Sequence, residues 1–233
     1  MGFIGRVGVK NYSIGGGRAW QFPAEDFFNR IRLNVFTGGL EDFNGLKLNE
    51  WTEFNFNMNG PLQSNVGIGF GPQDTNFNGQ VFDADFLYLF ANFRPKAGVN
   101  VSLNVQKNDA VDFANTRQGK SLTIRPNIGM RLGKHFQFNI NYNYQQFDVP
   151  GGQLFSSNLS DVRLTYQFDV RSFVRAIVQY SDTKRNPGLY TNTVKSRSKN
   201  LTTQLLYSYK LNAQTRFFVG YSDTGLENDD FDR

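Results

Sequence analysis

Apolar and polar side chains alternate with a period of two along much of this chain, most clearly between Leu122 and Tyr144. Such alternation puts one kind of side chain on each face of a β-strand. Gly133 and Lys134 alone separate two alternating runs, which predicts a long antiparallel hairpin. About ten residues of a strand tilted near 40° rise about 25 Å, the height of the apolar band on an outer-membrane barrel.

The same pattern predicts twelve strands. They are expected near residues 11–22, 29–38, 50–59, 65–71, 82–93, 99–107, 119–132, 135–147, 160–169, 173–182, 199–210 and 214–223. One parity of these strands is apolar and is expected to face lipid: Ile31, Leu33, Val35, Phe54, Phe56, Met58, Val99, Val101, Leu103, Val162, Leu164, Tyr166, Val174, Val178, Leu205, Tyr207, Phe217 and Val219.

The connections between these strands fall into two alternating classes. Long connections of about ten or more residues are expected to alternate with short ones, which is the pattern of long external loops and short periplasmic turns. A soluble sandwich has shorter strands and Greek-key crossings. We therefore predict an all-β fold, an antiparallel up-and-down transmembrane β-barrel. The expected short connections are residues 23–28, 60–64, 94–98, 133–134, 170–172 and 211–213.

The directions of the first and last expected strands indicate whether residues 1–233 can form a whole barrel. The first expected strand runs toward a short turn and the last runs away from one, so both termini lie on the long-loop side. Complete barrels normally begin and end on the periplasmic side, and closure pairs the last strand with the first. We expect residues 1–233 to be a single barrel domain, incomplete at both ends. The opening residues hold no apolar segment of signal-peptide length, so a leader has been removed or the chain is partial.

Composition narrows the class further. The longest apolar run, Phe86 to Ala91, is far below the roughly 20 residues that a membrane helix needs, so helical insertion is excluded. The absence of cysteine excludes disulfides and thiolate metal sites. A charged fraction of 19% does not argue against a barrel, because each strand averages an apolar face with a polar one.

Two segments carry a family resemblance: MGFIGRVGVKNYSIGGG, residues 1–17, and QLLYSYKLNAQTRFFVGYSD, residues 204–223. They resemble a bacterial family in which an outer-membrane barrel domain of unknown function follows a carbohydrate-binding family 9-like module. The resemblance spans nearly the whole chain and rests on strand and turn patterns without catalytic content. It implies upstream parts and a final strand that this sequence lacks, and it points toward carbohydrate handling.

The polar parity of the strands is expected to line the lumen and is mostly basic. Such a lining favours anionic solutes through rings of fixed charge. Alternatively the arginines form a structural ladder with Asn, Gln, Asp and Glu, and the pair Asp161 and Arg163 fits a salt bridge as well as a selectivity element. The expected lumen residues are Arg30, Arg32, Glu53, Arg125, Arg131, Asp161, Arg163, Arg175, Lys210 and Arg216.

Aromatic residues suggest two further features. The segment FLYLF, residues 86–90, is apolar on both parities, which indicates a plugged lumen or a strand covered on both sides. Tyrosines expected near strand ends predict an aromatic girdle at the headgroup layer, although ordinary strand packing would use the same residues. These are Tyr142, Tyr144, Tyr166, Tyr180, Tyr207, Tyr209 and Tyr221.

Catalytic and metal chemistry have little support. Barrel hydrolases need a histidine base beside a nucleophile, and the only histidine, His135, falls in a turn without a predictable partner. Asp83 and Asp85, and the carboxylates of residues 227–232, lack calcium-loop spacing and are interpreted as solvated charge. We predict no enzyme, no cofactor and no metal site.

Two remaining motifs concern ligands at the surface. Residues Gly15 to Gly17 lack the continuation of a phosphate loop and are expected to permit strand bending. The basic residues between Lys184 and Lys199 suit lipopolysaccharide phosphates, and a net charge of +5 makes nucleic acid the least favoured partner.

The sequence therefore predicts an outer-membrane barrel of a Gram-negative-type bacterium, acting as a passive pore or transport scaffold for anionic or carbohydrate-type solutes. Its expected partners are membrane lipid and lipopolysaccharide. One alternative is a non-transporting surface barrel whose loops bind glycan or a partner envelope protein. A second is a soluble β-sandwich lectin, in which the strand phenylalanines would face a second sheet rather than lipid.

Overall fold

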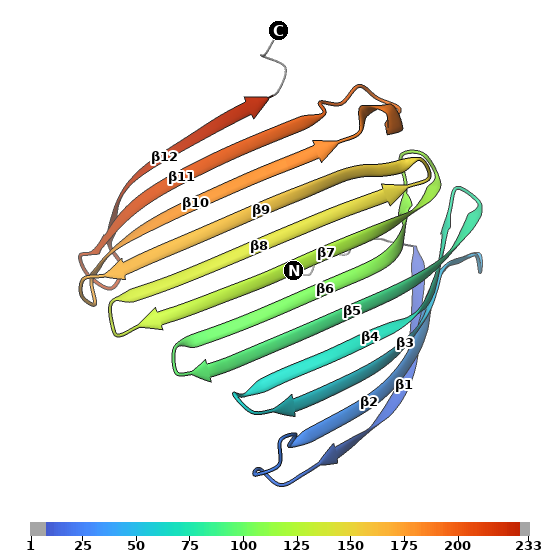
Figure 1. The fold of residues 1–233 in the computed structure, drawn as a ribbon, viewed down its shortest axis with the longest axis horizontal. Helices are drawn as coiled ribbons and strands as arrows, with labels where there is room; N and C mark the ends of the chain where they lie inside the picture. The colour runs from blue at the N-terminus through green and yellow to red at the C-terminus, as the bar shows by residue number, and fades with distance from the viewer. Residues whose placement is uncertain (1–7, 229–233) are drawn as a thin grey trace.

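The computed structural model describes residues 8–228 and forms one antiparallel sheet in which every strand pairs with its neighbours in sequence (Figure 1). The predicted all-β, up-and-down fold is confirmed. A 3₁₀ turn, η1 (Pro187–Leu189), lies between the tenth and eleventh strands. The strands are β1 (Val9–Gln21), β2 (Arg30–Asp42), β3 (Lys47–Gly60), β4 (Ser64–Phe77), β5 (Gln80–Lys96), β6 (Val99–Asp112), β7 (Arg117–Leu132), β8 (Phe136–Val149), β9 (Gly152–Gln167), β10 (Ser172–Arg185), β11 (Arg197–Lys210) and β12 (Arg216–Asn228).

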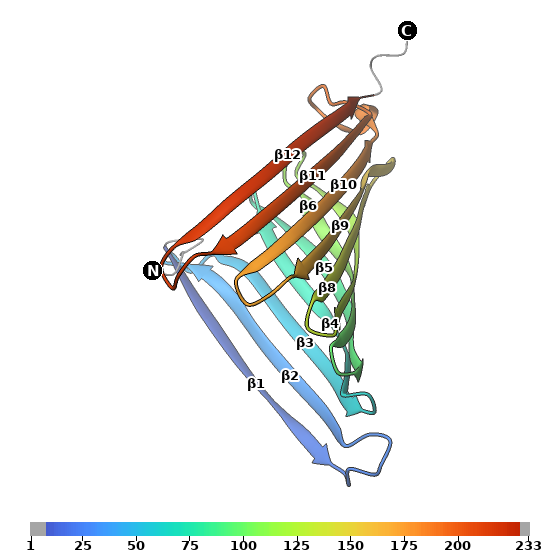
Figure 2. The same cartoon turned by 90° about the vertical axis from the view of Figure 1, so that its left-hand side faces the viewer.

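The sheet is a single curved layer. Figure 2 shows the outer strands β1 and β12 bending toward the same side, so that the sheet has a concave and a convex face. Within the described residues, β1 and β12 do not pair with each other. The buried apolar side chains of this part of the chain are only Phe82, Val149 and Leu154. Globular domains bury their apolar faces between two layers, and residues 8–228 form no second layer over this sheet.

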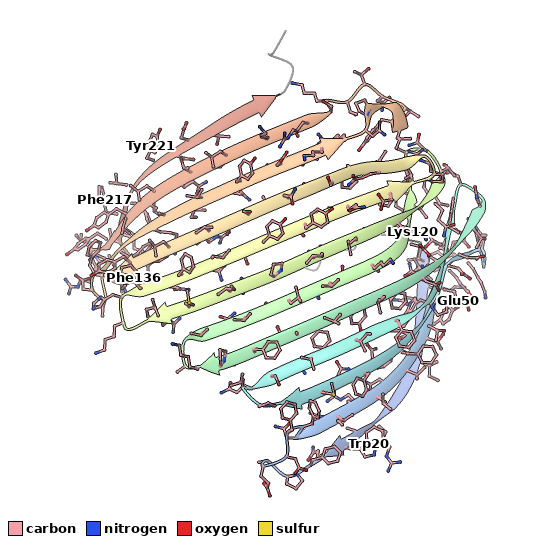
Figure 3. The ribbon with its side chains drawn as sticks, viewed as in Figure 1. Trp20, Glu50, Lys120, Phe136, Phe217 and Tyr221 are labelled. Carbon is pink, nitrogen blue, oxygen red and sulfur yellow. The ribbon has the colours of Figure 1, made fainter. Side chains whose placement is uncertain are left out.

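Cross-strand register keeps the alternation consistent from strand to strand. Ile31 lies opposite Met58 and Leu33 opposite Phe56, while Arg32, between them, lies opposite Asn57. The same apolar parity continues to β12, and all eighteen residues expected to face lipid share one face. Figure 3 looks onto the convex face and shows that Phe136, Phe217 and Tyr221 stand on it.

The convex face has an apolar band and a polar extension. Large apolar residues remain exposed across the band, for example Leu164 at 39% and Leu205 at 52% of their accessible surface. Toward the end that carries the 186–196 connection, the same face becomes polar at Glu50 and Lys120 (Figure 3). We call this the loop end, and the opposite end, with the turn at residues 133–135, the turn end.

Most residues that were expected to form long connections belong to strands in the structure. At the loop end the connections are residues 43–46, 78–79, 113–116, 150–151 and 186–196, so only the last is long. The predicted alternation of long and short loops is therefore wrong. The strands continue beyond the apolar band, where both faces are polar and the alternation that marks a strand disappears. Their backbones stay paired there, as at Asp74 opposite Asp83.

Residues 86–90 were expected to mark a plug or a doubly covered strand, and the structure shows neither. Leu87 and Leu89 belong to the convex apolar face, whereas Phe86, Tyr88 and Phe90 lie on the concave face opposite glycines of β4. No other described segment covers them. Within residues 8–228, no helix is long and apolar enough to cross a membrane.

Candidate functional site: the concave face

All ten residues predicted to line a lumen share the concave, polar face. Arg32 is opposite Asn57, Arg125 is opposite Asn104, and Lys210 is opposite Arg216. Side chains crowd on this side of the curved sheet, where Thr123, Asp161 and Ser208 are buried. The register thus joins residues from seven strands into one surface, but it does not gather their charges into one cluster.

Several of these charges belong to a structural network. The Arg163 guanidinium Nε donates to Asp161 Oδ1 at 2.8 Å, and the Asn141 amide donates to the same oxygen at 3.3 Å. Asp161 is only 8% exposed. Arg125 Nε donates to Asn143 at 3.2 Å. For these arginines the ladder interpretation of the sequence describes the geometry well.

Asparagine amides fill the centre of the concave face. Asn127 donates to Asn141 Oδ1 at 2.6 Å, and Asn141 donates to Asn139 at the same distance. Asn100 on β6 extends the row by donating to Asn127 at 3.3 Å. An amide both donates and accepts hydrogen bonds, so this row presents a neutral, hydrated surface.

A cavity of about 550 Å³, the aromatic pocket, opens on the concave face toward the loop end. Strands β3 to β6 supply most of its walls, and Phe113 comes from the β6–β7 connection. Its described lining contains no Lys or Arg; of its three acidic residues only Glu53 belongs to the concave face, whereas Asp85 and Asp109 share the parity of the convex face. The lining residues are Trp51, Glu53, Gln73, Thr75, Phe82, Ala84, Asp85, Phe86, Tyr88, Gln106, Asn108, Asp109, Ala110, Val111, Phe113 and Gln118.

Two parallel aromatic rings line the aromatic pocket. The planes of the Phe86 and Tyr88 rings are parallel within 6°, with centroids 6.5 Å apart. This follows from their spacing, because residues two apart on a strand share a face. A Cβ at Gly69 would lie 2.3 Å from the Tyr88 ring, so only glycine lets this ring lie against β4. The Tyr88 hydroxyl donates to Glu53 Oε1 at 2.5 Å and also contacts Asn55.

A second cavity of about 1040 Å³, the basic pocket, lies at the turn end. Arg94, Lys96 and Arg131 line it together with the concave amides of Asn65 and Asn139. Its described lining contains no Asp or Glu. Arg94 and Lys96 were expected in a connection, but β5 continues to Lys96. Sequence reasoning therefore missed two of its three cations. Residues 94–98 were expected to form a connection, so Arg94 and Lys96 were not assigned to a face of the sheet.

No family model, curated protein or solved structure matches this chain. The resemblance to an outer-membrane barrel family stays a prediction.

The seven predicted girdle tyrosines share the convex, apolar face. Tyr166 lies at the turn end, where its ring packs against Phe136 at 4.8 Å and Phe168 at 4.9 Å between centroids. Tyr142 lies nearer the loop end, and its hydroxyl donates to Asn158 at 2.5 Å. Tyr207 and Tyr221 stand farther from the strand ends, opposite Val219 and Leu205 respectively.

The residues weighed for catalysis have structural surroundings. The His135 ring Nδ1 lies 2.5 Å from the backbone oxygen of Gln167 in the turn region. Asp83 and Asp85 lie within β5, in the strand expected near residues 82–93, and both are exposed. Among the residues that the structure describes, no three His, Asp or Glu side chains gather as a metal site would require.

Two carboxylates at the loop end are held by arginines. Asp182 accepts from Arg197 Nε at 2.9 Å and Nη2 at 2.8 Å, and this guanidinium holds the pKa of Asp182 below its usual value. Burial alone would raise the pKa of Asp112, but hydrogen bonds from Asn115 and Arg117 outweigh it and lower that pKa. These pairs tie the strand extensions together where the apolar band has ended.

Proposed function

We propose that this chain forms the wall of an outer-membrane β-barrel that acts as a passive pore or transport scaffold for small polar solutes. The supporting observation is the division of one uncovered sheet into an apolar convex face and a polar concave face. In water, the exposed apolar band has no partner layer. In a bilayer, lipid covers it, and antiparallel strands satisfy their backbone groups within the sheet.

The dimensions of the sheet fit this environment. Strands of 13 to 17 residues exceed the length needed to cross the hydrocarbon layer. Tyrosines toward both ends of several strands suit the two headgroup layers. The polar extensions at the loop end then project beyond the membrane, where basic residues near Lys184 can meet lipopolysaccharide phosphates.

The proposal includes closure of the sheet. An open edge in lipid leaves backbone N–H and C=O groups without hydrogen-bond partners, at a cost of several kcal/mol for each group. In the proposed barrel the edges of β1 and β12 therefore pair, either with each other or with further strands. The concave face then becomes the lumen, with an amide-rich centre, the aromatic pocket and the basic pocket on its wall.

The alternatives have less support. A sandwich lectin needs a second sheet over Phe54, Phe136 and Phe217, and the described part of the chain forms one sheet only. A surface barrel that binds partners through long loops would have a single long connection here, residues 186–196. The curved sheet with a continuous polar concave face favours a pore.

The test is electrophoretic and electrical. The protein, in its full-length context, should fractionate with outer membranes and migrate as a compact band that shifts on boiling. Purified protein in a planar bilayer should then conduct ions in stable steps. A water-soluble monomer without a heat shift would contradict the membrane wall, and a folded, membrane-bound protein without conductance would contradict the pore.

A further inference from the structure

We propose that the aromatic pocket is a binding subsite for neutral oligosaccharides. This inference rests on the proposed function, since it names the solute class that the concave wall would handle. It begins from an anomaly in the pattern. Most concave positions of the central strands are Asn, Gln, Ser, Thr or Arg, but Trp51, Phe86 and Tyr88 place three partly exposed rings on this polar face within one pocket, beside the buried ring of Phe82.

The rings present a surface that a sugar can use. One face of the Tyr88 ring lies against Gly69, which leaves its opposite face toward the cavity. The Phe86 ring is parallel to the Tyr88 ring within 6°, with its centroid 6.5 Å away. The C–H groups on one side of a pyranose ring form a flat apolar patch, and such a patch packs face to face on an aromatic plane. All three side chains are only partly buried, so a ligand can reach them.

The rim of the pocket supplies the polar half of sugar recognition. Glu53, Gln73, Gln106 and Asn108 combine amides, which donate and accept, with a carboxylate, which accepts. Hydroxyl groups also donate and accept, so a carbohydrate can satisfy such a mixture. A volume of about 550 Å³ also lies within the usual range of ligand sites, about 300–1,000 Å³.

Charge selects the kind of sugar. Glu53 is the one carboxylate of the lining that shares the concave face with the rings, and no Lys or Arg lines the pocket, so a carboxylated or sulfated sugar would meet repulsion without a counter-ion. Neutral oligosaccharides meet no such penalty. Anionic solutes are better matched to the basic pocket at the other end of the concave face.

Binding can be measured without ion conductance. The sequence contains two tryptophans, Trp20 on the convex face and Trp51 in the pocket. A Trp20→Phe variant of the full-length protein in detergent keeps Trp51 as the reporter for a panel of maltohexaose, cellohexaose and laminarihexaose, and a Trp20→Phe/Trp51→Phe variant gives the signal to subtract. Hexagalacturonate is the anionic comparison. We expect saturable changes in fluorescence with at least one neutral sugar and a weaker response to the anionic one.

Variants locate the site. Phe86→Leu keeps an apolar side chain but removes the ring, and should raise the Kd for the neutral sugar about three- to tenfold. Asn108→Ala should weaken binding by a similar factor on the opposite wall. Phe218→Ala is the matched control, because it removes a concave ring on β12, outside the pocket. It should leave the Kd unchanged. Heat-shift electrophoresis confirms that each variant is folded.

The outcomes separate the two proposals. Neutral-sugar binding that Phe86→Leu weakens supports the subsite, whether or not the protein conducts. A folded protein that binds none of the three neutral sugars overturns the subsite, and the rings then serve only to pack against glycine. Tighter binding of hexagalacturonate, unaffected by Phe86→Leu, overturns it as well. Conductance is scored separately and tests only the pore.

Discussion

The two faces of this sheet follow different rules, although the same twelve strands build both. On the convex face the apolar pattern repeats from strand to strand, from Ile31 opposite Met58 to Tyr207 opposite Val219. On the concave face the chemistry changes with position, from aromatic and acidic at one pocket to basic at the other. A uniform face indicates a uniform environment, and a varied face indicates local tasks.

The two faces should differ most in how much an introduced charge destabilises the protein. Val162→Arg introduces a cation in the middle of the convex band, opposite Ile140 and Val178. We expect it to lower the free energy of unfolding in lipid vesicles by about 2–4 kcal/mol, the cost of arginine at a bilayer midplane. Urea titration of the reconstituted protein measures this. Gln179→Arg, on the exposed concave side of the next strand, is the control and should change stability by less than about 1 kcal/mol.

The second prediction concerns the ion pair between Asp161 and Arg163 on the concave face, which we expect to stabilise the sheet. Asp161→Asn removes the acid that holds Arg163, and should lower the free energy of unfolding by about 1 kcal/mol, a value reduced because Arg163 is half exposed. Urea titration again measures the loss, and a double-mutant cycle with Arg163→Gln isolates the pair. A coupling energy near zero would show that this ion pair does not stabilise the sheet.

A smaller effect compares the two pockets directly. Arg131→Glu reverses one charge of the basic pocket, and should lower the anion-to-cation permeability ratio about threefold because fixed charges set local ion concentrations. Reversal potentials in a salt gradient measure this ratio. Glu53→Gln, in the aromatic pocket, should shift the ratio weakly in the opposite direction. Equal shifts of the same sign would contradict opposite local charge at the two pockets.

The smallest effect depends on pH at the loop end. The pKa values of Asp112 and Asp182 are lowered in the folded state, so each carboxylate contributes stability above its unfolded pKa of about 3.9. That contribution is lost as the pH falls through the lower, folded pKa. Thermal unfolding at pH 5 and pH 3 should show a drop that Asp182→Asn reduces. An unchanged drop in this variant would exclude the Asp182 contribution.

Strand order and faces could be predicted because they depend on local alternation. The hairpin around Gly133 is the clearest case, with β7 and β8 meeting at residues 133–135. The strand extensions could not be predicted, because residues 72–77 carry polar side chains on both faces and include Pro72. There the signal of alternation is missing, while pairing with β5 still fixes the backbone.

The pockets required information that no single strand contains. Trp51, Phe86 and Asn108 are far apart in sequence, and only the registers of β3 with β4, β4 with β5 and β5 with β6 bring them together. The FLYLF segment, residues 86–90, was correctly singled out as unusual, but the expected plug or double cover is wrong. Its meaning depends on the glycines opposite, Gly67 and Gly69, which leave room for the rings.

The central claim is that the convex face meets lipid and the concave face meets water, and single cysteines test it most directly. The sequence has no native cysteine. Val162→Cys and Gln179→Cys variants would each carry an environment-sensitive fluorophore and be reconstituted into vesicles with brominated lipid. The account predicts strong quenching and a blue-shifted emission at position 162, and water-like, unquenched emission at position 179. Water-like emission at both positions would contradict it.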